Sequence, residues 1–534
     1  MRDAPPQIIY LKDYAPFGWE VEDVHLTFAL APNTTRVTAR IAFTPKPDAG
    51  TRMFLHGEQL ALQWAKIDGA DVTATFVDGG LEVDVPTHPF VWEAEVEIDP
   101  AGNTALEGLY MSNGMYCTQC EAEGFRKITY YPDRPDVMSI FTVRIEGAEP
   151  VRLSNGNPTG AGDTWSEWHD PWPKPAYLFA LVAGDLRATP GTFNTASGLS
   201  VDLNIWVRPG DEHKTDFALE ALKKSMIWDE QVYGREYDLD VFNIVAVDDF
   251  NMGAMENKGL NVFNSSAVLA SPETSTDGNF ERIEAIIAHE YFHNWTGNRI
   301  TCRDWFQLCL KEGLTVFRDA QFTADMRSAP VKRIEDAIEL RGRQFPEDQG
   351  PLSHPVRPES FQEINNFYTA TVYEKGAEVI GMLKTLVGDA AYARALDLYF
   401  DRHDGQACTI EDWLAVFEDT TGRDLSQFKR WYSQAGTPTV TVSETMDQGT
   451  YVLTLRQTLP PSPTTPNPQP QVIPFAMGLL DTDGTEILST KVLELTAAEQ
   501  SFRFELDGAT DMPVMSPLRA FSAPVLLEHA TDHA

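Results

Sequence analysis

Cysteine is scarce in this sequence, with only five residues among 534: Cys117, Cys120, Cys302, Cys309 and Cys408. A small, odd number in a chain of this size argues against a disulfide framework and favours a reducing compartment. Cys117 and Cys120 form a lone C-x-x-C motif with no second pair at zinc-finger spacing. We therefore expect a loop dithiol there rather than a redox or metal site.

Positive charge is also scarce. Lysine and arginine total 42 against 79 aspartates and glutamates, so the formal net charge is −37. Such a field repels phosphate backbones, and we expect no nucleic-acid partner. It is compatible with steering of cationic peptide termini, but we expect most of these carboxylates to be solvated surface groups.

Long apolar runs are missing as well. No segment approaches the roughly 18 consecutive apolar residues that indicate a membrane span. The run at residues 177–183 is typical of the short ones present. The start, residues 1–6, lacks the basic-then-apolar pattern of a secretory signal. We expect a cytoplasmic monomer without membrane contact.

The chain is too long for one hydrophobic core and predicts several domains. Apolar residues alternate with polar or small ones over residues 24–30 and again over 37–43, which is typical of strands. We therefore expect an N-terminal β-sheet domain, a sandwich or saddle, over residues 1–186. The overall fold class would be multidomain α+β.

The middle of the chain has a different pattern. Helical spacing begins at Leu219, residues 242–247 form a short apolar strand, and residues 280–435 are mostly helical. Helices are predicted in particular over 373–386 and 414–431. This indicates a mainly helical catalytic domain over residues 187–436.

Alternation returns after Pro438, interrupted by a proline-rich loop over residues 460–474. Residues 437–534 therefore predict a small C-terminal β-sandwich. We interpret the proline-rich loop as a hairpin excursion rather than a ligand for an SH3-type domain.

The sequence His-Glu-Tyr-Phe-His at residues 289–293, followed by Glu312 after 18 intervening residues, combines three metal ligands with a base. Four residues of helix turn a side chain through roughly 400° and raise it about 6 Å, so His289 and His293 converge on one ion. Glu290 lies about 100° around the helix, beside the position where a water must lose a proton. Two imidazoles and one carboxylate leave a fourth position open, which is typical of catalytic zinc.

An H-x-x-x-H pair alone is also compatible with two surface histidines. The context favours a metal site: Asp277 or Asn279 is placed to cap a helix with apolar residues at helical spacing, and Gly297 ends it. A second helical pattern over residues 306–317 contains Glu312. A turn between the two helices would bring Glu312 back to the histidines as the third ligand. The ligand types narrow the metal without deciding between zinc, cobalt and manganese.

The segment Asn-Met-Gly-Ala-Met-Glu-Asn, at residues 251–257, follows the predicted strand. Alone it carries little chemical signal, and Glu256 would be an ordinary surface acid. Together with H-E-x-x-H and the later glutamate, G-A-M-E-N resembles the aminopeptidase N family of thermolysin-like gluzincin zinc exopeptidases. The resemblance is strongest to the bacterial alanyl aminopeptidase branch and spans about residues 8 to 526. Four segments carry it: residues 117–136, 289–317, 365–380 and 430–438.

The resemblance implies that His289, His293 and Glu312 bind one Zn²⁺ per chain and that Glu290 activates the attacking water. It also implies that Tyr373 donates to the oxyanion of the tetrahedral intermediate, as a phenol is suited to do. From the residues alone, Tyr373 would be a packed helix aromatic.

The same resemblance assigns substrate contacts. Glu121 and Glu256 match the acids that hold the free α-ammonium of a peptide. Two carboxylates aimed at one cation would accept only chain ends, because an internal peptide nitrogen bears no charge. The backbone around Gly253 and Ala254 would pair with the substrate as an added strand. The substrate-binding set is completed by Gln119, Met252, Met255, Asn257 and Tyr368.

Gln119, Met252 and Tyr368 match residues that line the pocket for the first side chain. Met252 is flexible enough to reshape that pocket, which fits the broad specificity (Ala, Arg, Lys and Leu types) that the family implies. From the residues alone, Met252 would be core filler.

The sequence departs from the family in length. Members continue into a large C-terminal helical domain that closes over the active site, and this sequence stops about where that domain begins. An uncovered site would be wetter and its electrostatics weaker.

We therefore expect a zinc aminopeptidase of peptide catabolism that acts on peptides with a free N-terminus. A catalytically weak peptide-binding scaffold is the alternative. An epoxide hydrolase, an activity of one branch of the superfamily, has no positive sign in these residues.

Overall fold

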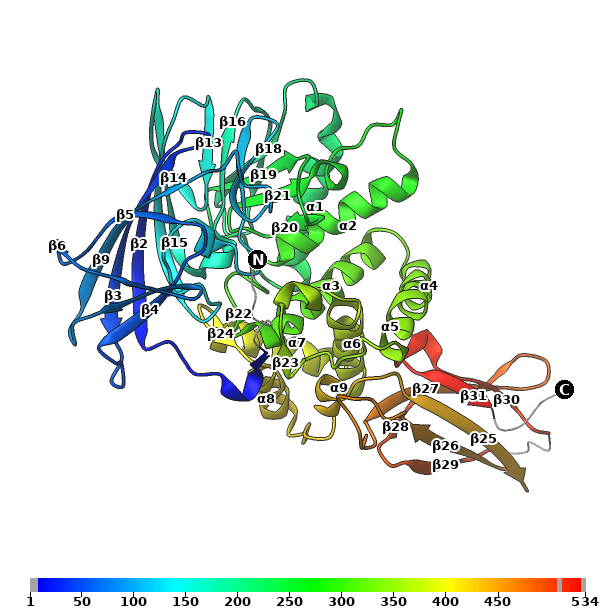
Figure 1. Cartoon of the computed structure of the whole chain (residues 1–534). Coiled ribbons are helices and arrows are strands. Elements are labelled where there is room, and N and C mark those ends of the chain that lie inside the picture. Colours follow the sequence, from blue (N-terminus) through cyan, green and yellow to red (C-terminus); the bar gives the residue numbers. More distant parts are fainter. Residues whose placement is uncertain (1–7, 507–510, 530–534) are drawn as a thin grey trace. The chain divides into compact units, whose positions relative to one another are not determined.

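The computed structural model describes residues 8–506 and 511–529, which form two compact units (Figure 1). The amino-terminal unit comprises Ala15–Trp305 and His403–Cys408, and the carboxy-terminal unit comprises Met1–Tyr14, Phe306–Arg402 and Thr409–Ala534. Residues 1–6, where the sequence predicts no secretory signal, lie outside the described part.

An eight-stranded sheet dominates the start of the amino-terminal unit, at the blue end of the colour scale in Figure 1. Apolar residues such as Val24, Leu26 and Phe28 are fully buried while their neighbours in the strand are more exposed, as the alternating sequence predicts. The strand order is β14 (Asn157–Gly162), β15 (Trp165–Pro175), β12 (Met138–Glu146), β2 (Trp19–Ala29), β3 (Thr35–Pro45), β9 (Phe90–Ile98), β5 (Ala61–Ile67) and β6 (Ala70–Asp71).

Two smaller sheets belong to the same unit. One has the order β10 (Gly108–Ser112), β11 (Met115–Gln119), β16 (Leu181–Gly184) and β13 (Val151–Ser154); the other has the order β4 (Arg52–His56), β8 (Gly80–Asp84) and β7 (Thr75–Val77). Cys117 lies within β11 and Cys120 lies in the loop directly after it, so the predicted loop position is wrong for Cys117 and confirmed for Cys120. Burial raises the pKa of Cys117 to about 12 and that of Cys120 well above its usual value, which keeps both thiols protonated and unreactive at neutral pH.

A five-stranded sheet follows, with the order β17 (Arg187–Asn194), β18 (Ser200–Val207), β19 (Val241–Val247), β21 (Leu260–Asn264) and β20 (Ala254–Met255). Strands β18, β19 and β21 are parallel, and every residue of β19 is buried, which explains its continuous apolar sequence. Helices α1 (Asp216–Val232) and α2 (Asp277–Phe292) pack against each other. The predicted strand at 242–247 and the helix containing Leu219 are confirmed.

Helix α2 begins one residue earlier than the sequence suggested. Thr276, not Asp277 or Asn279, is the N-cap. The Thr276 hydroxyl accepts from the Asn279 backbone N–H at 3.3 Å, and the Asn279 side chain accepts from the Thr276 N–H at 2.9 Å. This reciprocal capping box satisfies two backbone donors at once, which Asp277 alone would not do.

Seven α-helices are assigned in the carboxy-terminal unit: α3 (Leu308–Met326), α4 (Ala329–Glu339), α5 (Phe345–Gln349), α6 (Gly376–Val387), α7 (Asp389–His403), α8 (Ile410–Thr421) and α9 (Arg430–Ser433). The helix predicted over residues 414–431 is interrupted, because α8 ends at Gly422 in the left-handed conformation (φ 70°). The two-stranded pairs are β1 (Ile9–Tyr10) with β23 (Ser360–Phe361) in this unit, and β22 (Thr301–Cys302) with β24 (Ala407–Cys408) in the other.

Two facing sets of strands form the predicted C-terminal β-sandwich. One sheet has the order β29 (Glu499–Glu505), β26 (Thr450–Thr458), β25 (Thr439–Asp447) and β31 (Leu526–His529); the other has the order β28 (Glu486–Leu495), β27 (Ile473–Leu480) and β30 (Val514–Ser516). Val440, Val442, Tyr451, Leu453 and Leu455 are fully buried, as their alternation predicts. The multidomain α+β class is confirmed.

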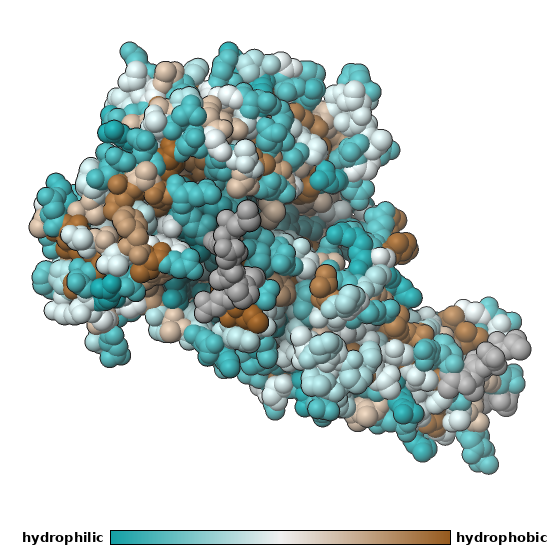
Figure 2. Space-filling model, viewed as in Figure 1, coloured by the Kyte–Doolittle hydropathy of each residue, from teal (hydrophilic) through white to brown (hydrophobic). Residues whose placement is uncertain are grey.

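The face drawn in Figure 2 is mainly hydrophilic, with scattered apolar patches. Among the described residues, no helix has both the length and the apolar character needed to cross a bilayer. All five cysteines are buried.

Candidate metal centre and substrate site

The histidine pair lies at the end of helix α2. His289 occupies the last turn, and His293 is the C-cap with helical dihedral angles (φ −59°, ψ −20°), so the helical spacing extends through both residues. Their Nε2 atoms are 3.0 Å apart. His293 Nδ1 lies 2.8 Å from the carbonyl oxygen of Thr296, which makes Nδ1 the protonated nitrogen and gives Nε2 the lone pair that can bind a metal. Two facing Nε2 atoms are therefore a chemically suitable pair of ligands for a divalent cation.

Gly297 makes room for the His293 ring. It has φ 149°, and a Cβ at this position would lie 2.8 Å from His293 Nδ1. The loop after the helix also folds back on itself, because Gly297 N–H donates to Ile300 O at 2.8 Å and Asn298 N–H donates to His293 O at 2.9 Å. The glycine thus fixes the orientation of the second imidazole.

Substitution Gly297→Ala is expected to weaken metal binding by about 10- to 100-fold, because loss of the hydrogen-bond partner of a metal-ligating histidine typically lowers metal affinity by that factor. The added methyl would push the His293 ring away from Thr296 O. Competition with a chromogenic chelator measures the change. Gly234→Ala is the matched control, because Gly234 also has positive φ (64°) but a Cβ there meets nothing within 4 Å. Equal affinities in the two variants would contradict this role.

Three carboxylates gather beside the histidines in the amino-terminal unit. Oxygens of Glu256 and Glu290 and a nitrogen of His293 lie within 4.8 Å of one another, and all three residues are buried. Oxygens of Glu121 and Glu256 are also within 4.8 Å. Glu121 follows strand β11, Glu256 follows strand β20 and Glu290 lies in α2. Buried acids at this spacing repel one another unless cations lie between them, so the arrangement suits a metal ion and an ammonium group.

The G-A-M-E-N segment lies at the edge of the five-stranded sheet. Strand β20 pairs only with β21, and Gly253 is exposed with open space around its Cα. An edge strand of this kind is suited to pairing with an extended peptide. Met255 and Asn257 are buried, and the Asn257 amide donates to Phe179 O at 3.3 Å.

The residues expected to line the first side-chain pocket have different surroundings. Gln119 is 2% exposed at the end of β11, and its amide donates to the Glu121 carbonyl at 3.4 Å. Met252 is half-buried just before β20. Tyr368 lies in the carboxy-terminal unit, where its ring centroid is 6.3 Å from that of Tyr373.

Glu312 and Tyr373 belong to the carboxy-terminal unit. Glu312 is buried in α3 and accepts a hydrogen bond from the equally buried Lys311. Helix α3 passes very close to the start of α6, because a Cβ on Gly313 would lie 2.9 Å from the carbonyl carbon of Gly376. This glycine-to-glycine approach sets the spacing between the helix of Glu312 and the turn of Tyr373.

Tyr373 lies in a single π-helical turn, η9 (Thr371–Lys375), which leads into α6. Such turns often occur at functional sites. The turn is held by a buried ion pair between Lys375 and Asp348 at 2.7 Å, and Asp348 also accepts from the Thr437 hydroxyl at 3.0 Å. Burial alone would raise the pKa of Asp348, but Lys375 and the hydrogen bonds hold it below its usual value.

Glu374, the neighbour of Tyr373, makes stability depend on pH. Its Oε2 is buried without a hydrogen-bond partner, and burial raises the pKa of this carboxyl to about 7. The carboxyl has a lower pKa in the unfolded chain, so the unfolded chain loses this proton at a lower pH than the folded protein. The free energy of unfolding therefore falls as pH rises from about 4.5 to 7 and stays at this lower value above pH 7.

Substitution Glu374→Gln is accordingly expected to stabilise the protein at pH 8 by about 1–3 kcal/mol and to leave its stability at pH 4.5 nearly unchanged. Unfolding midpoints measured across this pH range test the sign. Glu335→Gln, at an exposed position of α4, serves as the control. A gain that is the same at both pH values would contradict the assignment.

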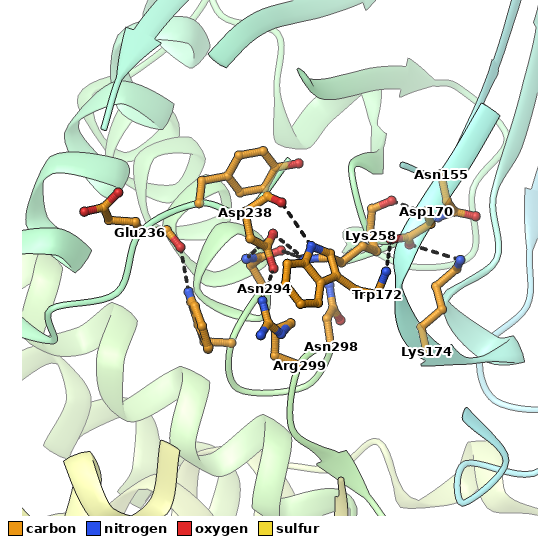
Figure 3. A network of polar contacts seen from close by, with 12 residues as sticks. Asn155, Asp170, Trp172, Lys174, Glu236, Asp238, Lys258, Asn294, Asn298 and Arg299 are labelled. Carbon is orange, nitrogen blue, oxygen red and sulfur yellow. Dashed lines mark hydrogen bonds and ion pairs between the residues drawn. The ribbon is translucent and has the colours of Figure 1, made fainter. Parts of the chain in front are cut away.

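Sequence reasoning did not find the buried polar network around Asp238 and Lys258 (Figure 3). Lys258 directly follows G-A-M-E-N, Asn294 directly follows the second histidine, and Asn298 and Arg299 come shortly after it. Their place shortly after the two motifs was the only indication of this network in the sequence. The key partner, Asp238, is 20 residues before Lys258 and carries no motif.

Comparison with known families matches all three parts of the chain. Residues 217–432 match the peptidase family M1 domain, and residues 20–178 match the peptidase M1 N-terminal domain. Residues 436–530 match a domain of unknown function with an Ig-like fold.

Individual relatives agree. Aminopeptidase N of Caulobacter vibrioides is 53% identical over 541 residues, which cover 99% of this chain and 62% of that protein. Aminopeptidase N of Escherichia coli K12 is 49% identical over 542 residues, which cover 98% of this chain and 62% of that protein. The crystal structure of Legionella pneumophila aminopeptidase A in complex with aspartic acid matches with a TM-score of 0.90 and 32% identity, over 98% of this chain and 61% of that one. The chain spans less than two thirds of the length of these relatives. The two M1 matches together take in more than half of the chain, which therefore belongs to peptidase family M1.

Proposed function

We propose that this chain is a metal-dependent aminopeptidase that removes N-terminal residues from short peptides. The observation that carries the proposal is the gathering, within one unit, of two facing imidazole Nε2 atoms with the carboxylates of Glu121, Glu256 and Glu290. The relatives described above are all aminopeptidases, which favours an enzyme over a peptide-binding scaffold.

In this proposal His289, His293 and Glu312 hold one zinc ion. When bound, zinc supplies Lewis acidity at the scissile carbonyl and makes a water acidic enough to react. Glu290 accepts the proton of the attacking water and passes it to the leaving amine. Tyr373 donates a hydrogen bond to the carbonyl oxygen as that oxygen gains charge.

Glu121 and Glu256 would bind the free α-ammonium of the substrate. Ionised donors and acceptors form the strongest hydrogen bonds, and a neutral internal peptide nitrogen leaves the two buried carboxylates uncompensated. We propose that the substrate backbone pairs with the edge at Gly253 and Ala254, with Met255 and Asn257 holding that segment in place. Gln119, Met252 and Tyr368 would line a pocket that accepts several side chains, which gives broad specificity.

The cysteine content bears on the cellular compartment of the enzyme. The small, odd number of cysteines fits a reducing compartment, so we propose a cytoplasmic role in peptide catabolism, with the chain acting as a monomer. The division into domains at 1–186, 187–436 and 437–534 stays a prediction.

Hydrolysis of alanyl, arginyl and leucyl nitroanilides by metal-loaded protein tests the proposal. We expect turnover that a chelator abolishes and added zinc restores, and no turnover of the N-acetylated alanyl compound. No turnover by protein with stoichiometric metal would favour the scaffold alternative. Equal cleavage of free and acetylated substrates would contradict a site that reads the chain end.

A further inference from the structure

A buried network of charges includes Lys258, which is two residues after Glu256 in the sequence (Figure 3). Lys258 is 1% exposed, and its ammonium lies 2.5 Å from Asp238 Oδ1 and 2.8 Å from Asn294 Oδ1. A buried ammonium needs such partners, because losing water without them is costly. The position of the Lys258 side chain is therefore tightly constrained.

Asp238 connects Lys258 to the loop after the histidines. Its Oδ1 also accepts from the Asn294 amide at 3.2 Å, and its Oδ2 accepts from Arg299 at 2.7 Å. Arg299 in turn binds Asp404 and lies 3.6 Å above the centroid of the Trp172 ring. Both carboxylate oxygens of Asp238 thus have partners.

The main chain of the segment is held as well. Asn155 donates to Lys258 O at 2.9 Å, and Asn298 donates from its side chain to Glu256 O at 2.8 Å. The backbone N–H of the same Asn298 donates to His293 O at 2.9 Å. One residue therefore bridges the main chains of Glu256 and His293.

We propose that Lys258 is a positioning residue for the aminopeptidase reaction, with Asn298 as its main-chain counterpart. Lys258 is two residues from Glu256, and its partner Asn294 adjoins His293. The network holds the amine-binding carboxylate at a fixed distance from the metal-binding imidazoles. This inference rests on the proposed function, because positioning has a measurable consequence only if Glu256 binds an amine.

Substitution Lys258→Met tests the role. It leaves Asp238 paired with Arg299 and Asn294, so no buried charge loses all its partners. Lys174→Met is the matched control: Lys174 is equally buried, 3.0 Å from Asp170, and its ammonium lies over the Phe141 ring rather than against the histidine loop. Asp170 keeps a hydrogen bond from the Trp172 N–H in that variant.

The readout is inhibition by leucine hydroxamate relative to isocaproic hydroxamate, which lacks the amine, at confirmed full metal occupancy. We expect Lys258→Met to reduce the preference for the amine-bearing inhibitor by about 10- to 100-fold, the loss typical of a small misplacement. Affinity for the amine-free inhibitor should stay near that of the wild type. Asn298→Ala should act in the same direction, and Lys174→Met should leave the preference unchanged.

An unchanged preference in Lys258→Met would overturn the inference, and so would an equal loss in Lys174→Met, which would indicate only general loosening. A wild-type protein that shows no preference between the two inhibitors would contradict the proposed function itself. The two failures are therefore distinguishable.

Discussion

Replacing Glu290 by glutamine is expected to lower kcat by about 100- to 10,000-fold, the contribution typical of a positioned general base. The amide keeps the shape of the side chain but cannot accept the proton of the attacking water. Glu290 is 7% exposed and close to His293 and Glu256, so bulk water is a poor substitute for it. Steady-state kinetics on alanyl nitroanilide, with metal content measured on the same sample, give the loss.

Metal binding should survive this change, because the ligands we assign are the two histidines and Glu312. Glu281→Gln, nine residues earlier in α2, is the control and should retain wild-type kcat. A loss of less than about tenfold in Glu290→Gln would contradict the assignment of the base.

Replacing Tyr373 by phenylalanine should lower kcat by about 100- to 1,000-fold, the effect of removing one donor to an oxyanion. KM should change little, because the carbonyl oxygen carries its full charge only in the transition state. Kinetics over a range of substrate concentrations separate the two parameters.

Tyr368→Phe is an informative comparison. We assign Tyr368 to the side-chain pocket, so its loss should change KM more than kcat. If the two tyrosine variants had the same kinetic profile, Tyr373 would be a packing residue of the π-helical turn, as its sequence alone suggested.

The sequence specified the local parts of the site well. The spacing of His289 and His293 survives because both residues keep helical dihedral angles, although the helix formally ends at Phe292. Alternating apolar residues predicted the strands around Val24 and Val440, where one face is buried. Patterns of this kind depend only on neighbours in the chain.

Contacts between distant residues were not predictable in the same way. The pairing of Lys258 with Asp238 spans 20 residues and that of Arg299 with Asp404 spans 105. No local period encodes such pairs, because tertiary packing brings them together. The π-helical turn at Tyr373 was also missed, since its apolar pattern is that of an ordinary helix.

The predicted helix boundaries were wrong for a different physical reason. Side-chain hydrogen bonds decided that α2 starts after Thr276, and one left-handed glycine decided that α8 ends at Thr421. Both are single-residue effects on backbone conformation, which hydrophobic spacing does not register.

A crystal structure of the zinc-loaded protein with a peptide analogue that bears a free amine tests the central claim most directly. The account predicts zinc held by His289, His293 and Glu312, with the amine between the carboxylates of Glu121 and Glu256. A metal held by other residues, or an amine that points away from both acids, would contradict it.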